Sequence, residues 1–332
     1  MSIVSQKMNT ENRFAITVDH FFKKFSLGSI LKESNAYTEK GVPCVHVFKV
    51  LLMLAFSGKN LFMNYAAENH EIPFARDVVY RFLNSVHINW QRFLYLLSAK
   101  VINHHIDALT ADNRADAFVI DDSFYSRTRS KAVELLSWVK DHADGNKNKK
   151  GFRMLTLGWT DGNSFIPVAF NLLSSADSKV RINPARESLD KRVVGFKRRE
   201  NALSTSPESA LAMLKQAVAA GIKAKYVLFD SWFSFPSTII RVCKMNLNVI
   251  AMLKDTPKIY YTFNGGRKSL REIYRTVRKR RGRAKYLASV LVELHDKEGN
   301  TAPAKIVFVR DRRNKSKLVY YCLALSERGF LK

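Results

Sequence analysis

One stretch decides the expected fold of this chain: Lys225-Tyr226-Val227-Leu228-Phe229-Asp230-Ser231-Trp232. Its apolar run predicts a strand that delivers a single carboxylate, Asp230, at its C-terminal end, where a helix signal follows. A second run, Ala117-Phe118-Val119-Ile120, ends in the same way in Asp121-Asp122-Ser123. Because desolvating an unpaired carboxylate is costly, each aspartate needs a partner. The two strand ends are therefore candidates for a shared cation site.

The charge balance indicates a polyanionic partner. The chain has 55 Lys plus Arg against 29 Asp plus Glu, a formal charge of +26 over 332 residues, which is typical of proteins that bind nucleic acid or anionic membranes. The best apolar run, Val50–Phe56, is too short to span a bilayer, and the N-terminus lacks the apolar stretch of a signal peptide. Three scattered cysteines support neither a disulfide framework nor a cysteine zinc site. We expect a cytoplasmic protein that contacts DNA and no membrane.

Residues 1–110 are expected to form a helical domain that binds DNA. The runs His46–Leu54, Phe74–Leu83 and Trp90–Ile106 carry apolar residues at helical spacing. Short helices that expose Arg76 and Arg81 would suit a helix-turn-helix-like module that contacts DNA. A plain helical bundle fits the same pattern, and the sequence leaves both interpretations open.

Residues 111–255 are expected to form an α/β core. Phe118–Asp121, Arg153–Trp159 and Phe165–Asn171 have the character of three consecutive strands. The turn Thr160-Asp161-Gly162-Asn163 is a strong hairpin signal between the last two.

The second half of this core alternates helix and strand. The basic stretch Ser174–Asn201 predicts a loop, and Ser206 is a good cap for a helix that Gly221 stops. The strand that ends at Asp230 is followed by a helix near residues 237–244 and a strand at Asn248–Leu253. Three antiparallel strands followed by alternating helix and strand are the order of an RNase H-like core, a mixed sheet flanked by helices.

Residues 256–332 are expected to form a basic helix and a β-rich insertion. The run Arg267–Lys285 contains ten basic residues and one acid, Glu272, and is either a solvated basic face or a surface that contacts the DNA backbone. Three β-rich runs follow at Tyr286–Leu294, Ala304–Arg310 and Lys317–Leu325. The candidate DNA contacts in the basic run are Arg271, Arg275, Arg278, Lys279 and Arg280.

Cleavage of a phosphodiester needs an activated attacking oxygen and stabilisation of the developing charge, which divalent ions can supply. Hard oxygen ligands suit Mg²⁺, or Mn²⁺ in its place. In an RNase H-like core the first and fourth strands are neighbours, so Asp121 and Asp230 could meet as metal ligands. The alternative is a purely structural role, in which Asp230 and Ser231 only cap the following helix. Whether Asp121 or Asp122 is the first ligand is left open, because both faces of a central strand are covered.

Four ordered blocks resemble bacterial insertion-sequence transposases of the DDE class, specifically insertion sequence family four. They are Val119–Ser123, Lys150–Gly162, Phe165–Val168 and Leu228–Phe233, and the resemblance runs from about residue 20 to the C-terminus. It implies an RNase H-like catalytic domain with a β-rich insertion and Mg²⁺-dependent cut-and-paste transposition, often through hairpin ends. It also implies double-stranded DNA partners, namely terminal inverted repeats and target DNA, and a homodimer on DNA. By position, Asp121 matches the first catalytic aspartate and Asp230 the second.

One departure concerns the family's third carboxylate, which lies in a helix with the pattern Tyr, two residues, Arg, three residues, Glu, six residues, Lys. Tyr274 comes nearest, but Val277 and Arg281 stand at the Arg and Glu positions. Glu272 is expected to pair with arginines, and Glu327 follows the last strand without a helix to hold it. We therefore expect a truncated or frameshifted reading frame that lacks its catalytic glutamate, or one part of a product completed elsewhere.

Two other functions fit the same residues. A non-catalytic DNA-binding protein, such as a repressor of an intact transposase, would need the helical domain but not Asp121 or Asp230. A structure-specific nuclease of the same fold would cut branched or single-stranded DNA without terminal repeats. Trp232 has two interpretations as well, a core aromatic or a platform on which a displaced base stacks.

Overall fold

The computed structural model describes residues 3–58, 60–67, 72–109, 114–186, 189–281, 284–311, 313–314 and 317–326. It divides into two compact units. The first consists of Met1–His105 and Arg186–Glu200, and the second of Ile106–Ala185 and Asn201–Lys332. In the part of the chain that the structure describes, no helix combines the length and the apolar character needed to cross a bilayer.

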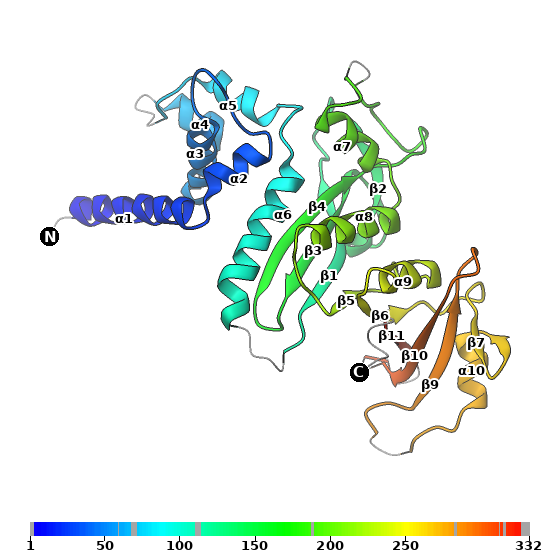
Figure 1. Ribbon diagram of the computed structural model, residues 1–332. Helices are drawn as coiled ribbons and strands as arrows, with labels where there is room; N and C mark the ends of the chain where they lie inside the picture. The colour runs from blue at the N-terminus through cyan, green and yellow to red at the C-terminus, as the bar shows by residue number, and fades with distance from the viewer. Residues whose placement is uncertain are drawn as a thin grey trace. The chain divides into compact units, whose positions relative to one another are not determined.

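The first unit is helical, as the sequence predicts for its runs of helical periodicity. Its helices are α1 (Ile3–Lys24), α2 (Leu27–Glu33), α3 (Cys44–Ser57), α4 (Leu61–Ala66), α5 (Arg76–Leu83), α6 (Trp90–Val101) and α7 (Val194–Ala202), labelled in Figure 1. Gly58, at a φ of 67°, ends α3, and the Asn60 side chain caps α4 by accepting from the Met63 N–H at 2.8 Å. After α6 a π-helical turn continues to Ile106.

The predicted loop Ser174–Asn201 extends too far, because residues from Val194 onward form α7. The Gly195 N–H donates to the Val86 carbonyl at 2.7 Å. A Cβ at Gly195 would lie 2.9 Å from the Val86 Cβ, so only glycine allows this close approach. Tertiary packing against Val86 therefore forms a helix that its own weak periodicity did not indicate.

The second unit is built on one mixed sheet. Its strands are β1 (Ala117–Ser126), β2 (Ser137–Asp141), β3 (Lys147–Thr160), β4 (Phe165–Leu173), β5 (Tyr226–Phe229), β6 (Asn248–Leu253), β7 (Tyr261–Phe263), β8 (Gly266–Lys268), β9 (Ala288–His295), β10 (Thr301–Arg310) and β11 (Leu318–Ala324). The order is β2-β3-β1-β5-β6-β11-β10-β9-β7-β8, with β4 also paired to β3. β1 is antiparallel to β3 and parallel to β5, which is parallel to β6. The predicted α/β class is therefore confirmed.

Three helices accompany the sheet: α8 (Ser206–Ala219), α9 (Pro236–Cys243) and α10 (Leu270–Thr276). α8 packs on β3 and β4, and α9 packs on β6 and β9. The N-terminal cap of α8 is Thr205, one residue before the predicted Ser206, and it accepts from the Glu208 N–H. Gly221, at a φ of 81°, follows the end of α8 as predicted.

Two strands differ from the prediction. β1 does not end at Asp121 but continues to Ser126, because β3 pairs with it from Ala117↔Thr160 to Ser126↔Gly151. β2 was not predicted, since its five residues Ser-Trp-Val-Lys-Asp place polar side chains on both faces. Pairing with the long strand β3 makes this short polar segment a strand.

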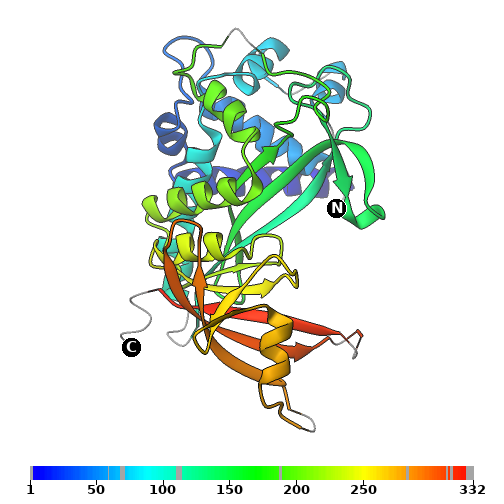
Figure 2. The ribbon, with the colours of Figure 1, turned by 90° about the vertical axis from the view of Figure 1, so that its right-hand side faces the viewer.

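The last third of the chain extends the core sheet. β11 pairs antiparallel with β6, with Cys322 opposite Ala251, so β9, β10 and β11 continue the same sheet. Figure 2 shows these strands and α10 at the end of the sheet opposite to β2. The predicted basic helix is shorter than expected: α10 ends at Thr276, and Val277 is extended. Arg278–Arg281 place like charges within one helical turn, which disfavours a longer helix.

The start of α10 depends on a reciprocal cap. The Ser269 side chain accepts from the Glu272 N–H, and the Glu272 carboxylate accepts from the Ser269 N–H at 2.7 Å. We expect Ser269→Ala to destabilise α10 by about 1 kcal/mol, which corresponds to about fivefold faster amide hydrogen exchange in the helix. Ser269→Thr, which keeps the hydroxyl, is the matched control. Equal exchange rates in the Ala variant and the parent would show that the cap is not needed.

Candidate functional site

The structure brings the two predicted aspartates together. β5 runs parallel to β1 with Ile120 opposite Phe229, so Asp121 and Asp230 are the next positions along two adjacent strands. Asp230 directly follows the end of β5, as predicted. Asp121 lies inside β1, where Thr156 of β3 is its partner on the other side. The pairing of distant segments thus creates a carboxylate pair at the C-terminal end of β5.

The alternation of side chains places Asp121 and Asp230 on one face of the sheet. Val119 and Leu228 are register partners, and both are half-buried, whereas Ile120 is buried on the opposite face. Asp121 and Asp230 each lie two residues beyond these partners, so they share their face. Asp122 lies two residues beyond Ile120 and belongs to the opposite face.

Asp122 is already neutralised by an ion pair. Its Oδ2 accepts from Arg153 Nη1 at 2.6 Å, and the two side chains are only 17% and 19% exposed. Asp121 is exposed and forms no ion pair with any residue that the structure describes. Of the two aspartates that the sequence left open, Asp121 lies on the same face as Asp230 and forms no ion pair among the described residues, whereas Asp122 pairs with Arg153.

Each carboxylate of the pair is held by one backbone N–H. Asp121 Oδ1 accepts from the Asp122 N–H, and Asp230 Oδ1 accepts from the Trp232 N–H, both at 2.8 Å. Within the described ranges, no hydrogen bond engages the Oδ2 atoms of Asp121 and Asp230. One oxygen of each carboxylate is thus fixed and the other is available.

The pair repels itself when both members are charged. The pKa of Asp230 is raised, first by partial burial, and then by the negative charges of Asp121 and, more weakly, Asp122. The Trp232 N–H and the Lys254 ammonium oppose this rise. Because like charges disfavour ionisation at close range, a bound cation would stabilise the ionised pair.

The donor set fits a hard divalent cation. Two carboxylate oxygens on one sheet face match the few protein ligands that Mg²⁺ takes, with water or phosphate oxygens completing its shell. Among the residues that the structure describes, no group of three or more His, Cys, Asp or Glu side chains is arranged to hold a metal. Asp121 and Asp230 could therefore supply two ligands of an ion, and the described residues supply no third carboxylate, histidine or cysteine placed to join them.

Other acids after Asp230 have partners elsewhere. Glu272 caps α10, Asp255 pairs with Arg271 at 2.9 Å, and Glu293 pairs with His295 at 3.2 Å. Glu272 was expected to pair with arginines, and its hydrogen bonds go instead to Ser269. Glu327 lies outside the described residues.

Trp232 is exposed beside the carboxylate pair, so its interpretation as a core aromatic is wrong. Its side chain is 44% exposed. Lys254 Nζ lies 5.0 Å and Arg153 Cζ 6.0 Å from the centre of its ring, and the His142 ring lies 6.2 Å away. The sequence pattern did not indicate these neighbours. The available signal was Arg153 itself, which alternates with the buried Leu155 and Leu157 and therefore needs a partner.

The five predicted DNA contacts after Gly266 are all exposed. Arg271 is paired with Asp255, Lys279 Nζ lies 4.9 Å from the Tyr274 ring centre, and Arg280 Cζ lies 4.1 Å from that of Tyr286. Arg275 and Arg278 are exposed and form no ion pair within the described part of the chain. Arg275 helps to lower the pKa of Glu272, whereas Arg278 interacts with no acid among the described residues.

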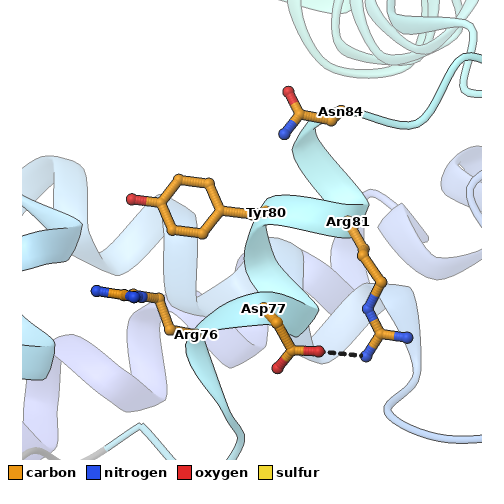
Figure 3. Close-up of a pocket in the computed structure, with 5 residues that line it drawn as sticks. All are labelled: Arg76, Asp77, Tyr80, Arg81 and Asn84. Atoms are coloured by element: carbon orange, nitrogen blue, oxygen red, sulfur yellow. Dashed lines mark ion pairs between the residues drawn. The ribbon is translucent and has the colours of Figure 1, made fainter.

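The predicted contacts on α5 line an open hollow of about 540 Å³ with Asp77, Tyr80 and Asn84. Figure 3 shows Arg76 and Tyr80 on one side of the helix and the Asp77–Arg81 ion pair on another. That pair is 2.8 Å long and well exposed. Arg76 keeps an uncompensated charge among the described residues, whereas that of Arg81 is balanced by Asp77.

Comparison with known proteins gives one family. A family model described as DDE superfamily endonuclease matches residues 52–316, a range that contains Asp121 and Asp230. No curated protein matches the chain.

The charge of Asp230 should lower the stability of the metal-free protein as the pH rises. Its raised pKa means that the folded state keeps a proton at a pH where the unfolded chain, with an ordinary aspartate pKa of about 3.9, has lost it. Stability therefore falls as the pH rises through the interval between the two values, and Asp230→Asn should remove this fall. Urea unfolding without metal, at a series of pH values from acidic to neutral, measures it. A constant difference between variant and parent at every pH would contradict the argument.

Proposed function

The chain belongs to the DDE superfamily endonucleases, and from this premise we propose that it is a DNA transposase of the insertion sequence family four type. The observation that carries the proposal is the pair of Asp121, in β1, and Asp230, directly after the adjacent strand β5, on one face of the sheet. Its expected reaction is metal-dependent DNA strand cleavage and transfer in cut-and-paste transposition. Its expected substrates are duplex DNA ends with terminal inverted repeats and a target DNA. The protein is expected to bind them as a homodimer.

The sheet supports an RNase H-like catalytic core. The five strands β4, β3, β1, β5 and β6 lie side by side in that order. The first three strands of the core are antiparallel and the last two run parallel to β1. The first and fourth of these strands along the chain, β1 and β5, are neighbours, which supports such a core and brings the end of β5 beside β1.

In the proposed reaction Asp121 and Asp230 would hold Mg²⁺ or Mn²⁺ with their carboxylates. When bound, the cation supplies activation of the attacking water or 3′-hydroxyl and stabilisation of the charge that develops on the phosphate. The Asp122 and Trp232 N–H groups orient the two carboxylates. The exposed indole of Trp232 offers a stacking surface for a base near the cut end. Lys254 places a positive charge beside it.

DNA affinity is proposed to come from two basic surfaces. One is the helix α5 with Arg76 and Arg81, and the other is the run after Gly266. The second surface comprises Arg271, Arg275, Arg278, Lys279 and Arg280. Together with a formal charge of +26, they support binding that depends strongly on salt.

A second candidate function is a non-catalytic DNA-binding protein, such as a repressor related to transposases. This function is favoured because, among the described residues, no third metal-ligating side chain joins Asp121 and Asp230. Substitution of both Asp121 and Asp230 by alanine discriminates, because repression would survive it and metal-dependent cleavage would not. Because only two carboxylates would hold the cation, we expect the parent chain to bind repeat DNA but to cleave it slowly. Rapid cleavage by the parent would show that a third ligand is present.

Metal binding should stabilise the protein through the aspartate pair. Binding to the folded state alone contributes about 1.4 kcal/mol at a tenfold excess of ion over Kd. With two carboxylates we expect a Kd on the order of millimolar. A Mn²⁺ titration should raise the melting temperature of the parent but not that of Asp230→Asn. Asp190→Asn, which changes an exposed aspartate paired with Arg192, is the control and should respond like the parent. Identical curves for parent and Asp230→Asn would refute the shared site.

The basic surface after Gly266 can be tested by salt dependence. Loss of one phosphate contact should reduce the slope of log K against log salt by about 0.9. We expect this change for Arg278→Gln and a smaller one for Arg271→Gln, because Asp255 already neutralises Arg271. Lys297→Gln, in the exposed turn between β9 and β10, is the control. Unchanged slopes for Arg278→Gln would exclude this residue from the DNA contact.

A further inference from the structure

Arg153 lies next to Asp122 and Trp232, the two residues whose backbone N–H groups donate to Asp121 and Asp230. It lies on β3, opposite Phe124 of β1. Its Nη1 donates to Asp122 Oδ2 at 2.6 Å, and its Cζ lies 6.0 Å from the centre of the Trp232 ring. One guanidinium thus reaches a residue of β1 and a residue that follows β5.

These two residues hold Asp121 and Asp230. The Asp122 N–H donates to Asp121 Oδ1, and the Trp232 N–H donates to Asp230 Oδ1, both at 2.8 Å. The direction of each carboxylate therefore depends on where Asp122 and Trp232 lie. Arg153 is their common neighbour.

The ion pair of Arg153 with Asp122 is mostly shielded from solvent. The side chains of Arg153 and Asp122 are 19% and 17% exposed, so water screens their ion pair weakly. Lys254 also faces the Trp232 ring, at 5.0 Å, but its side chain is exposed and flexible. Among the residues described, Arg153 is the cation of this site that has both low exposure and two contacts.

We propose that Arg153 is a positioning residue of the carboxylate pair: it binds the Asp122 side chain and the Trp232 ring together, and so fixes the two backbone N–H groups that orient Asp121 and Asp230 for a divalent cation. This inference rests on the proposed metal-binding function. Asp122 then serves as an anchor for Arg153 and not as a metal ligand.

Arginine suits this role better than lysine. A planar guanidinium donates in its plane and stacks through its face, so it can pair with Asp122 and lie against Trp232 at once. An ammonium on the same site would keep the charge but lose one of the two contacts. Arg153→Lys should therefore be a poor replacement.

The test measures Mn²⁺ affinity of the full chain by electron paramagnetic resonance, together with the melting temperature. The variants are Arg153→Gln, Asp122→Asn and the double variant that carries both. Each single variant leaves one partly buried charge without its partner and should melt at a lower temperature. The double variant removes both charges and should recover most of that loss. Because residues that orient ligands typically change metal affinity by 10–100-fold, all three should bind Mn²⁺ about tenfold more weakly than the parent.

The matched control is the pair Arg241 and Glu208, which joins α9 to α8 in the same unit by two hydrogen bonds. The double variant Arg241→Gln, Glu208→Gln should keep the parent's Mn²⁺ affinity. A stable Asp122→Asn, Arg153→Gln protein that binds Mn²⁺ like the parent would overturn the positioning role while leaving the proposed function intact.

A second measurement separates this inference from the metal site. Amide hydrogen exchange of Asp122 and Trp232, without metal, should be faster in the stable double variant than in the parent, since their neighbour is lost. If the parent binds no Mn²⁺, the proposed function fails, and this exchange alone decides the positioning role. Equal exchange rates would then overturn it.

Discussion

The parallel pairing of β5 with β1 is the constraint on which the site depends. Without it Asp121 and Asp230 would be two isolated acids in a strongly basic chain. Four register pairs, from Ala117↔Tyr226 to Ile120↔Phe229, bring them to the same level of the sheet. Burial of Phe118 and Ile120 with their partners Val227 and Phe229 fixes the face on which each side chain lies. The hydrophobic face of the sheet thus determines the geometry of its polar face.

That geometry costs electrostatic energy, and the surrounding groups offset part of it. Partial burial and then the negative charges of Asp121 and Asp122 raise the pKa of Asp230. Arg153 neutralises Asp122, which leaves the repulsion mainly between Asp121 and Asp230. Lys254 faces the neighbouring indole and opposes the rise of the Asp230 pKa, but it forms no ion pair with either aspartate among the described residues. A carboxylate pair that forms no ion pair with the described residues of so basic a chain is the feature on which the proposed cation site rests.

The sequence predicts those parts of the second unit whose own residues carry the information. Asn248–Leu253 forms β6 as predicted because its apolar run is bounded by turn residues, and the Asp161-Gly162 turn joins β3 to β4. The misses are segments shaped by their neighbours. β2 and the second half of β1 are polar runs that become strands only because β3 pairs with both. The hydrogen bonds of such segments are made with residues far along the chain, so local patterns do not reveal them.

The site shows the same division. Both aspartates were predicted, since a carboxylate after an apolar strand is visible in the sequence, but Arg153, Lys254 and His142 were not, because only the fold brings them to Trp232. The choice between Asp121 and Asp122 needed the structure as well. Side chains alternate along a strand, so two consecutive aspartates cannot serve the same face. One turns to Asp230 and the other to Arg153. Under the proposed function, the doubled aspartate of β1 thus supplies one candidate ligand, Asp121, and one partner for Arg153, Asp122, on opposite faces of the strand.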